Sequence, residues 1–502
     1  MTTRGQPFGW PSLSHGNLQR LRKGQKMTTR QKPAGGTTDN ISTILRHNVR
    51  LDRIEYIRVD ALNSYGRKLR RRVKGTIEAL KASLQAFGIV SPILIDASNT
   101  IIGGEAIVEA ARALGYVDVP TIRVEHLDEA EVRFLRLALN KLSENSRWDE
   151  VELAVEFTEL IEMDTVLAYE VTGFSTPEID NLLYPSSVES ELDPDDDLSE
   201  VGKPGMAVSR IGDVWQLGRH RVLCGSSLDH GDLAILMDGQ IASMVLTDHP
   251  YNLKIDGFVS GNGKNKNREF VQASGDLSEE QFTDFLSTSI AALAARCRDG
   301  ALLYMFMDFR HQWEMMTGVR AAHLALLSMA VWVKASGGMG SFYRSQHELC
   351  YIAKKGKAPH TNNIQLGRFG RTRTTCWFYP GVNTFGAGRD ELLAMHSTCK
   401  NVSMLADAIR DATNRGEVVL DGFLGSGSTL IAAERTDRVC RGVELDPLYV
   451  DTIVHRWEKA TGQKAALIAS GETFDQVEMR RAAEALPQVN AVNPRPRVRP
   501  VV

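Results

Sequence analysis

The stretch 416–450, GEVVLDGFLGSGSTLIAAERTDRVCRGVELDPLYV, decides the fold class. An apolar run ends at Asp421, a glycine-rich turn follows, and a helix is predicted to open near Ser428. A second apolar run ends at Glu444, roughly twenty residues beyond the glycines. This order predicts a nucleotide-binding unit, because glycines let a ligand approach the backbone and the later acid accepts hydrogen bonds from ribose hydroxyls. NAD enzymes share the pattern, so the ligand stays open at this point.

Two other interpretations of the turn are weaker. A P-loop that grips phosphate is disfavoured, since no Lys precedes the Ser and Thr of GSGST. A turn that serves only strand–helix packing explains the glycines but not the acid that follows them.

The stretch Thr247–Asn252, TDHPYN, narrows the choice. It follows the apolar run IASMVL, which reads as a buried strand, and it delivers Asp248, His249, Pro250 and Tyr251 at the strand tip. A carboxylate beside a rigid proline ring and an aromatic ring at a strand tip is typical of a functional site.

Taken together, the two stretches resemble the amino-group DNA methyltransferases, whose Asp-Pro-Pro-Tyr tetrad and DPFxGSGTT loop correspond here to DHPY and DGFLGSGST. The tetrad precedes the glycine loop, which is the permuted order of the β class of that family. GDVWQLGRHRVLCG, GSFYRSQHE, HSTCKN and GVELDPLYV also match, so the resemblance covers about 206–462. It implies an α/β, Rossmann-like domain with a permuted, mixed sheet and S-adenosylmethionine as methyl donor.

The resemblance also implies roles for these residues. Asp248 and the carbonyl of His249 would accept hydrogen bonds from an exocyclic amino group and aim its nitrogen at the methyl group. Pro250 would stiffen the turn, and Tyr251 would stack on a base flipped out of the duplex. The cofactor would contact Asp421, Phe423, Gly425, Ser426, Gly427, Glu444, Thr398 and Lys400.

The identity of the target base follows from two features. Ring-carbon cytosine methylation needs a Cys nucleophile, typically after Pro, and the sequence has no Pro-Cys pair. N4-cytosine relatives often carry Ser where this chain has Asp248, which favours the N6 amino group of adenine.

Several positions depart from the family pattern. His249 replaces a Pro, Ser226 stands where relatives usually have an Asp near the adenosine, and Ser397 and Asn401 replace both prolines of HPTxKP. His249 keeps its carbonyl acceptor, so we expect activity to survive with some loss of rigidity. The alternative is a decaying active site.

A stretch without acidic residues lies between Glu348 and Asp390. Its basic and amide side chains are suited to phosphates and base edges, and its position between tetrad and glycine loop favours a DNA cleft over a merely solvated basic face. The predicted DNA contacts are Lys354, Lys355, Lys357, Arg368, Arg371 and Arg373.

The region 50–180 resembles the ParB-like domain family. GEAIVEAA stands where relatives have GHxRxxAA, with Ile107 in place of the Arg, so nuclease or CTPase activity is not expected. Amphipathic patterns predict helices in 75–88, 105–115 and around 130–144, and two short strands within 89–104. The basic cluster RKLRRRVKG (67–75) either contacts the DNA backbone or is simply exposed to solvent.

Composition divides the chain. We predict a disordered basic arm over 1–40, the ParB-like domain over 41–185, an acidic linker over 186–205, the methyltransferase domain over 206–470 and a tail over 471–502 whose last part is disordered.

Charge and cysteine usage set further bounds. The formal net charge of −3 means that DNA contact must come from a local patch. Six scattered Cys without a C-x-x-C pair predict free thiols in a reducing cytoplasm and no metal site. We see no membrane-spanning run and no signal peptide, and expect a cytoplasmic protein.

These observations predict an adenine-N6 methyltransferase that acts on double-stranded DNA and carries a ParB-like accessory domain. The alternatives are a non-catalytic ParB-like DNA-binding protein with a degenerate methyltransferase domain, N4-cytosine specificity, or an RNA or protein methyltransferase. A homodimer is one open arrangement.

Overall fold

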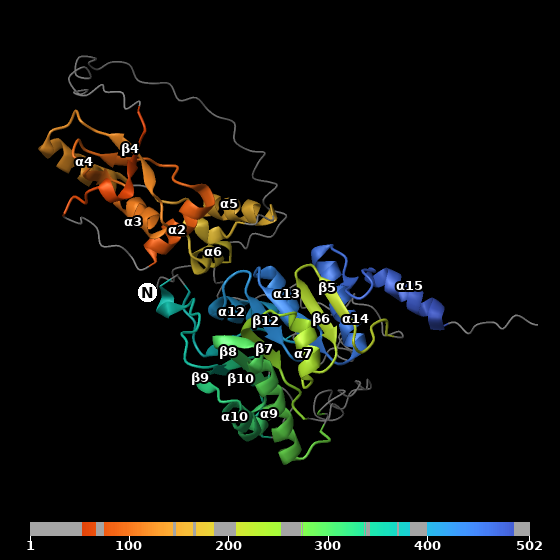
Figure 1. Cartoon of the computed structure of the whole chain (residues 1–502). Helices are drawn as coiled ribbons and strands as arrows, with labels where there is room; N and C mark the ends of the chain where they lie inside the picture. The colour runs from red at the N-terminus through yellow and green to blue at the C-terminus, as the bar shows by residue number, and fades with distance from the viewer. Residues whose placement is uncertain are drawn as a thin grey trace, which may run out of the picture. The chain divides into compact units, whose positions relative to one another are not determined.

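The computed structural model describes residues 53–66, 75–143, 147–163, 167–184, 207–252, 273, 275–335, 337, 342–368, 371–381 and 399–485 (Figure 1). The predicted basic arm, acidic linker and cluster 67–74 lie outside these residues, as does the tail beyond 485. The chain forms two compact units. The first comprises Met1–Arg70 and Ile89–Lys141, and the second comprises Arg71–Gly88 and Leu142–Val502.

The first unit is a small α+β domain. Its four-stranded sheet has the order β1-β4-β2-β3, in which only β2 and β4 run parallel. The strands and helices are β1 (Glu55–Arg58), β2 (Ile93–Ile95), β3 (Ile101–Gly103), β4 (Asp118–Arg123), α3 (Glu105–Ala113) and α4 (Glu129–Leu142), with a 3-10 turn at Val59–Ala61. The two short strands predicted within 89–104 are confirmed. Asp96 closes their turn, because its Oδ1 accepts hydrogen bonds from Ser98 N and Thr100 N.

The second unit begins with helices. They are α2 (Thr76–Phe87), α5 (Glu150–Glu162), the 3-10 helix η3 (Tyr169–Thr172) and α6 (Thr176–Leu183). Helix α2 ends at Gly88, whose φ of 72° suits glycine, as the sequence predicts. Helix α6 begins with a capping box, in which Ser175 and Glu178 satisfy each other's backbone N–H groups.

A ten-stranded mixed sheet forms the centre of the second unit, in the order β11-β9-β10-β8-β7-β12-β13-β6-β5-β14. The strands are β5 (Val214–Leu217), β6 (His220–Cys224), β7 (Ala242–Asp248), β8 (Cys297–Met307), β9 (Ala325–Val333), β10 (His347–Lys354), β11 (Cys376–Phe378), β12 (Val418–Asp421), β13 (Val439–Glu444) and β14 (Ala466–Leu467). Strands β8, β7, β12, β13 and β6 are parallel, and β10 is antiparallel to both of its neighbours. The earlier strand β7 lies beside the later strand β12, so the permuted α/β fold predicted from the motifs is confirmed.

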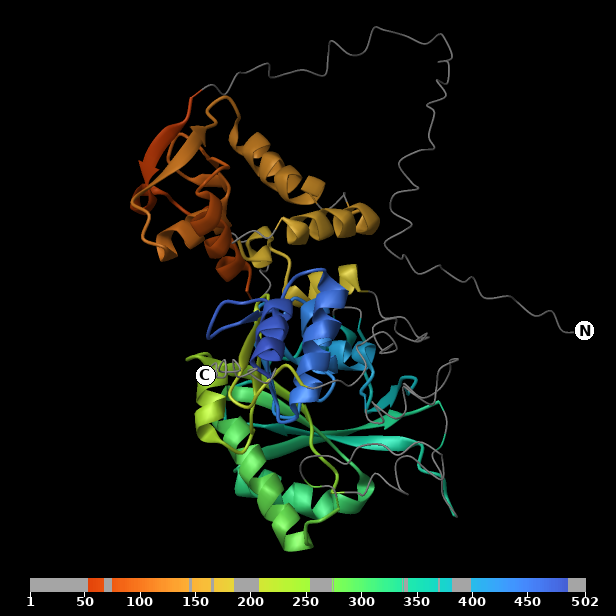
Figure 2. The ribbon, with the colours of Figure 1, turned by 90° about the vertical axis from the view of Figure 1, so that its right-hand side faces the viewer.

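Helices cover both faces of this sheet (Figures 1 and 2). One face packs against α12 (Val402–Ala412), α13 (Ser428–Arg435), α14 (Pro447–Thr461) and α15 (Phe474–Ala485). The other packs against α7 (His230–Met237), α9 (Glu279–Ala295) and α10 (Gln312–Ala321). Strand β7 is therefore buried on both sides, which explains its continuous apolar run. The carboxyl ends of the parallel strands meet at one edge, where ligands bind in open α/β sheets.

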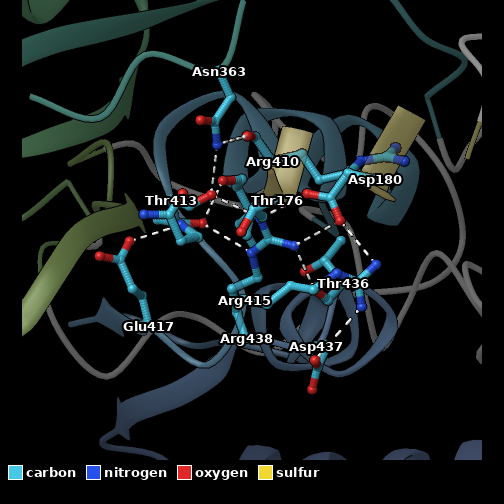
Figure 3. Close-up of polar contacts among 12 residues, drawn as sticks. Thr176, Asp180, Asn363, Arg410, Thr413, Arg415, Glu417, Thr436, Asp437 and Arg438 are labelled. Atoms are coloured by element: carbon cyan, nitrogen blue, oxygen red, sulfur yellow. Dashed lines mark hydrogen bonds and ion pairs between the residues drawn. The ribbon is translucent and has the colours of Figure 1, made fainter. Parts of the chain in front are cut away.

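A buried ionic cluster attaches α6 to this sheet domain (Figure 3). Asp180 accepts a hydrogen bond from Arg438 Nη2 at 2.8 Å, and its Oδ1 pairs with Arg415 Nη2 at 2.9 Å. Arg438 also donates to the carbonyl of Thr413 at 2.7 Å, and Tyr184 donates to the carbonyl of Arg435 at 2.8 Å. Helix α6, which the predicted boundaries place in the ParB-like domain, thus packs on the methyltransferase-like sheet. The boundaries themselves stay a prediction.

Candidate active site

Two loops that are far apart in the sequence meet at the tips of β7 and β12. The strands are parallel neighbours, with Leu420 opposite Val245. Thr247 Oγ1 donates to Asp421 Oδ1 at 2.8 Å and accepts a hydrogen bond from Gly422 N at 3.3 Å. The tetrad that begins at Asp248 therefore adjoins the glycine turn, as the sequence motifs require.

The conformation of the glycine turn depends on two left-handed glycines and on hydrogen bonds between its backbone and neighbouring side chains. Gly425 and Gly427 have φ values of 54° and 88°, which a side chain would make unfavourable. Gly425 N donates to Glu444 Oε2 at 2.8 Å, and Arg456 Nη1 holds the carbonyl of Ser426 at 3.0 Å. Asp421 Oδ1 accepts from Phe423 N at 3.0 Å. All predicted cofactor residues of this turn thus gather at one edge of the sheet.

Two acids lie at this edge, of which Asp421 is buried and Glu444 is half-buried. Burial raises the pKa of Glu444 to about 7 and that of Asp421 to about 6. Glu444 ends β13 and also accepts from Asp446 N at 2.8 Å. It is placed to accept further hydrogen bonds from ribose hydroxyls at the end of its strand.

Lys400, which the sequence assigns to the cofactor, lies beside the tetrad. Its Nζ contacts the carboxylate of Asp248 and lies 3.1 Å from Glu348 Oε2 and 3.4 Å from the hydroxyl of Tyr251. The neighbouring Cys399 Sγ, not Lys400, approaches Ser426 Oγ in the glycine turn, at 3.0 Å. Thr398 lies outside the described residues.

Glu348 is the site residue that sequence reasoning missed. Its Oε2 accepts a hydrogen bond from Tyr251 at 3.1 Å, and its Oε1 lies 2.5 Å from Lys334 Nζ. Burial alone would raise the pKa of Glu348, but Lys400 and Lys334 lower it to about 2. Its position at the end of GSFYRSQHE was the available signal, yet nothing local shows that this acid faces Asp248.

His249 points into the protein interior. Its side chain is buried, its ring packs against Phe423 at 5.1 Å between centroids, and its Nε2 lies 3.3 Å from Ser289 Oγ. Burial lowers the pKa of His249 to about 3, so the ring is neutral at physiological pH. The side chain fills the space between β7, α9 and the glycine turn and leaves its backbone for the site.

The predicted DNA contacts are only partly exposed. Arg371 is buried and pairs with Asp411 at 2.8 Å, and Arg373 pairs with the same acid at 3.1 Å. Lys355 Nζ donates to the carbonyls of Ala294 and Cys297 at 2.7 and 2.6 Å. Acids and carbonyls outside the acid-free stretch thus neutralise or hold these cations, and their contact with DNA stays a prediction.

The other three predicted contacts differ in exposure. Lys354 is half-buried and donates to the carbonyl of Ala358 at 3.3 Å. Lys357 and Arg368 are exposed.

Comparison with known families gives the site its context. Residues 242–455 match the N6/N4 methyltransferase family model, described as "DNA methylase", and residues 152–211 match the ParB-methyltransferase HTH domain. Over residues 242–455 this chain is a DNA methyltransferase of the N6/N4 class. The predicted fusion of ParB-like and methyltransferase parts is confirmed, and S-adenosylmethionine is the methyl donor of this class. The family model does not separate adenine-N6 from cytosine-N4 specificity.

Individual relatives are distant. The type II methyltransferase M2.MboI of Moraxella bovis is 21% identical over 225 residues, which cover 43% of this chain and 81% of that protein. The solved PvuII DNA methyltransferase (cytosine-N4-specific) is 15% identical, with 49% and 92% of the chains covered and a TM-score of 0.37. A chromosome-partitioning protein ParB from Caulobacter crescentus is 21% identical, with 26% and 76% covered and a TM-score of 0.23.

The residues present in this methyltransferase fit the donor. A Cβ added at Gly425 would meet open space, so a ligand can lie against the turn, and the Glu444 carboxylate stands at the adjoining strand end. When bound, S-adenosylmethionine supplies an electrophilic methyl group. The protein's own task is to hold the acceptor nitrogen and to keep the acids around it in the correct ionisation state.

The residues that the structure describes contain neither a membrane-spanning helix nor a metal-binding cluster. No helix among them is long and apolar enough to cross a membrane. Within the same ranges, no group of three or more His, Cys, Asp or Glu side chains is arranged to hold a metal ion.

Proposed function

We propose that this enzyme transfers a methyl group from S-adenosylmethionine to the N6 amino group of adenine in double-stranded DNA. The observation that carries the proposal is the state of the Asp248 carboxylate. Its Oδ2 contacts Lys400, whereas Oδ1 is buried and accepts no hydrogen bond from any described residue. Buried polar atoms normally have partners, so an unpartnered carboxylate oxygen marks the acceptor for a substrate N–H group.

The chemistry of the amino group explains why such an acceptor is needed. The lone pair of an exocyclic amino nitrogen is delocalised into the base. A hydrogen bond to Asp248 Oδ1 favours a tetrahedral nitrogen whose lone pair points at the methyl group, and this stabilises the transition state more than the ground state. Tyr251 adjoins the carboxylate and offers its ring to the flipped base.

The choice of adenine rests on Asp248, since Ser is frequent at this position in N4-cytosine relatives. Lys357 and Arg368 are the proposed phosphate contacts of the methyltransferase domain, because both are exposed. The ParB-like part would add to DNA engagement, and the enzyme would act in the cytoplasm. Asp421, Phe423, Gly425, Ser426, Gly427 and Glu444 are the proposed cofactor contacts.

The decisive experiment uses labelled S-adenosylmethionine and genomic DNA from a host without methylases. After transfer, the DNA is digested and the modified nucleoside is identified by mass spectrometry. We expect N6-methyladenine; N4-methylcytosine would overturn the base assignment. Absence of transfer would favour the non-catalytic DNA-binding alternative. Asp248→Ala should abolish transfer and leave cofactor binding measurable by calorimetry.

A further inference from the structure

The acid Glu348 lies at the same edge of the sheet as Asp248 because of strand direction. Strand β10 is antiparallel to β8, with Leu349 opposite Met307, the last residue of β8. Asp248 ends β7 opposite Phe306 of β8. The beginning of β10 therefore meets the carboxyl ends of β7 and β8, and two half-buried carboxylates from distant segments come together there.

The ammonium groups of Lys334 and Lys400 pair with these carboxylates. Lys334 Nζ lies 2.5 Å from Glu348 Oε1, Lys400 Nζ lies 3.1 Å from Glu348 Oε2, and Lys400 also contacts Asp248 Oδ2. The four charges alternate in sign and sum to zero. This alternation is what allows charged groups to be buried, since an uncompensated carboxylate here would take up a proton instead.

Lys400 has little freedom to move away from this position. Its ammonium group has three donors and approaches three oxygens, those of Asp248, Glu348 and the Tyr251 hydroxyl. The rings of Phe306, Tyr251 and Trp332 lie 5.2, 5.5 and 6.0 Å from Nζ. Without Glu348, one of these donors would be released and could turn onto the free oxygen of Asp248.

We propose that Glu348 is a positioning residue for methyl transfer: it holds Lys400 on one oxygen of Asp248, so that the other oxygen keeps no partner within the protein and can accept a hydrogen bond from the target amino group. The proposal rests on the proposed role of Asp248 as acceptor, and it holds for adenine or cytosine alike. Glu348 acts through Lys400, and Lys334 holds the far oxygen of Glu348 in place.

The test measures steady-state kinetics of the full-length enzyme at saturating S-adenosylmethionine. Glu348→Gln keeps an acceptor for Tyr251 but removes the charge that holds Lys400. We expect kcat to fall at least about tenfold, with the Kd for S-adenosylmethionine unchanged, because misplaced catalytic groups cost activity more than binding. Glu417→Gln is the matched control. Glu417 is as little exposed as Glu348, with 18% against 16% of its side chain accessible, and pairs with Arg298 at 2.9 Å outside the site, so kcat should not change.

The pH profile separates positioning from a merely structural role. The groups that face Asp248 are Lys400, Glu348 and Tyr251, with Asp421 on β12 and the Cys350 thiol on β10 close by. Removing the negative Glu348 should lower the pKa of Asp248 and move the acid limb of kcat to lower pH. Lys400→Met removes the positive neighbour and should move that limb to higher pH.

The outcomes are distinct. If Glu348→Gln keeps kcat within about twofold of the wild type, or if its acid limb does not move to lower pH, the proposal is overturned. Glu348→Gln alone decides this if Lys400→Met does not fold. A wild-type enzyme that methylates no DNA would refute the proposed function instead, so the two failures can be told apart.

Discussion

Substitution of Asp180 by Asn tests whether α6 is an integral part of the methyltransferase domain. The side chains of Asp180 and Arg438 are 2% and 0% exposed, and Arg415 is 4% exposed. The amide of Asn would leave Arg438 buried without this counter-ion, and Arg415 would keep only its pair with Asp437 at 3.5 Å. Removal of one partner from a buried ion pair typically costs about 3–5 kcal/mol of unfolding free energy, because the remaining charge stays desolvated.

Thermal and urea unfolding measure this loss. A change of this size should lower the melting temperature by at least about 5 °C, and the connection to α6 should become more sensitive to limited proteolysis. Glu159→Gln, an exposed acid on α5, is the control and should change stability by less than about 0.5 kcal/mol. The double variant Asp180→Leu, Arg438→Met should recover part of the loss, because apolar groups of similar volume can replace a buried pair.

A loss below about 1 kcal/mol in Asp180→Asn would refute the reasoning, since it would mean that the pair is solvated or that α6 detaches without cost. A large loss without any recovery in the double variant would show that packing, and not charge, holds the helix.

Three further predictions concern the site. His249→Pro should raise kcat, because Pro stiffens the turn, and should lower the free energy of unfolding by about 1–3 kcal/mol, because it removes a buried ring beside Phe423. Steady-state kinetics and melting curves test these two effects. An unchanged or lower kcat would contradict the explanation that His249 costs the turn rigidity. The affinity for S-adenosylmethionine should rise between pH 6 and 8, by up to about tenfold per pH unit below the pKa of Glu444 at about 7, because only the ionised carboxylate accepts two ribose hydrogen bonds without a proton of its own. Calorimetry at several pH values should show this slope in the wild type and not in Glu444→Gln. A flat wild-type profile would count against Glu444 as the ribose ligand. Lys357→Ala should weaken DNA binding and reduce by about one the slope of log K against log salt concentration, whereas Arg371→Ala should chiefly lower the melting temperature. The reverse pattern in filter-binding titrations and melting curves would indicate that Arg371 contacts DNA.

Local patterns in the sequence were enough for the two halves of the site. An apolar run, a pair of left-handed glycines and an acid at the next strand end specify the turn around Gly425, because each acts on its own backbone within one strand–helix–strand unit. The tetrad at Asp248 is equally local. Strand–helix–strand units build a parallel sheet, and this sheet brings the tetrad and the glycine turn together at neighbouring strand ends.

Charge pairing was decided only by the tertiary structure. Lys400, which the sequence assigns to the cofactor, contacts Asp248, a residue 152 positions away in the chain. Arg371 and Arg373, which the sequence assigns to DNA, both pair with Asp411. Helix α6, which the predicted boundaries place in the ParB-like domain, is likewise joined to the methyltransferase-like sheet domain by the pairing of Asp180 with Arg438. A basic side chain looks the same in a sequence whether it meets solvent, a phosphate or a buried carboxylate. Its partner is set by distance in space and by burial, and neither is encoded within a few residues.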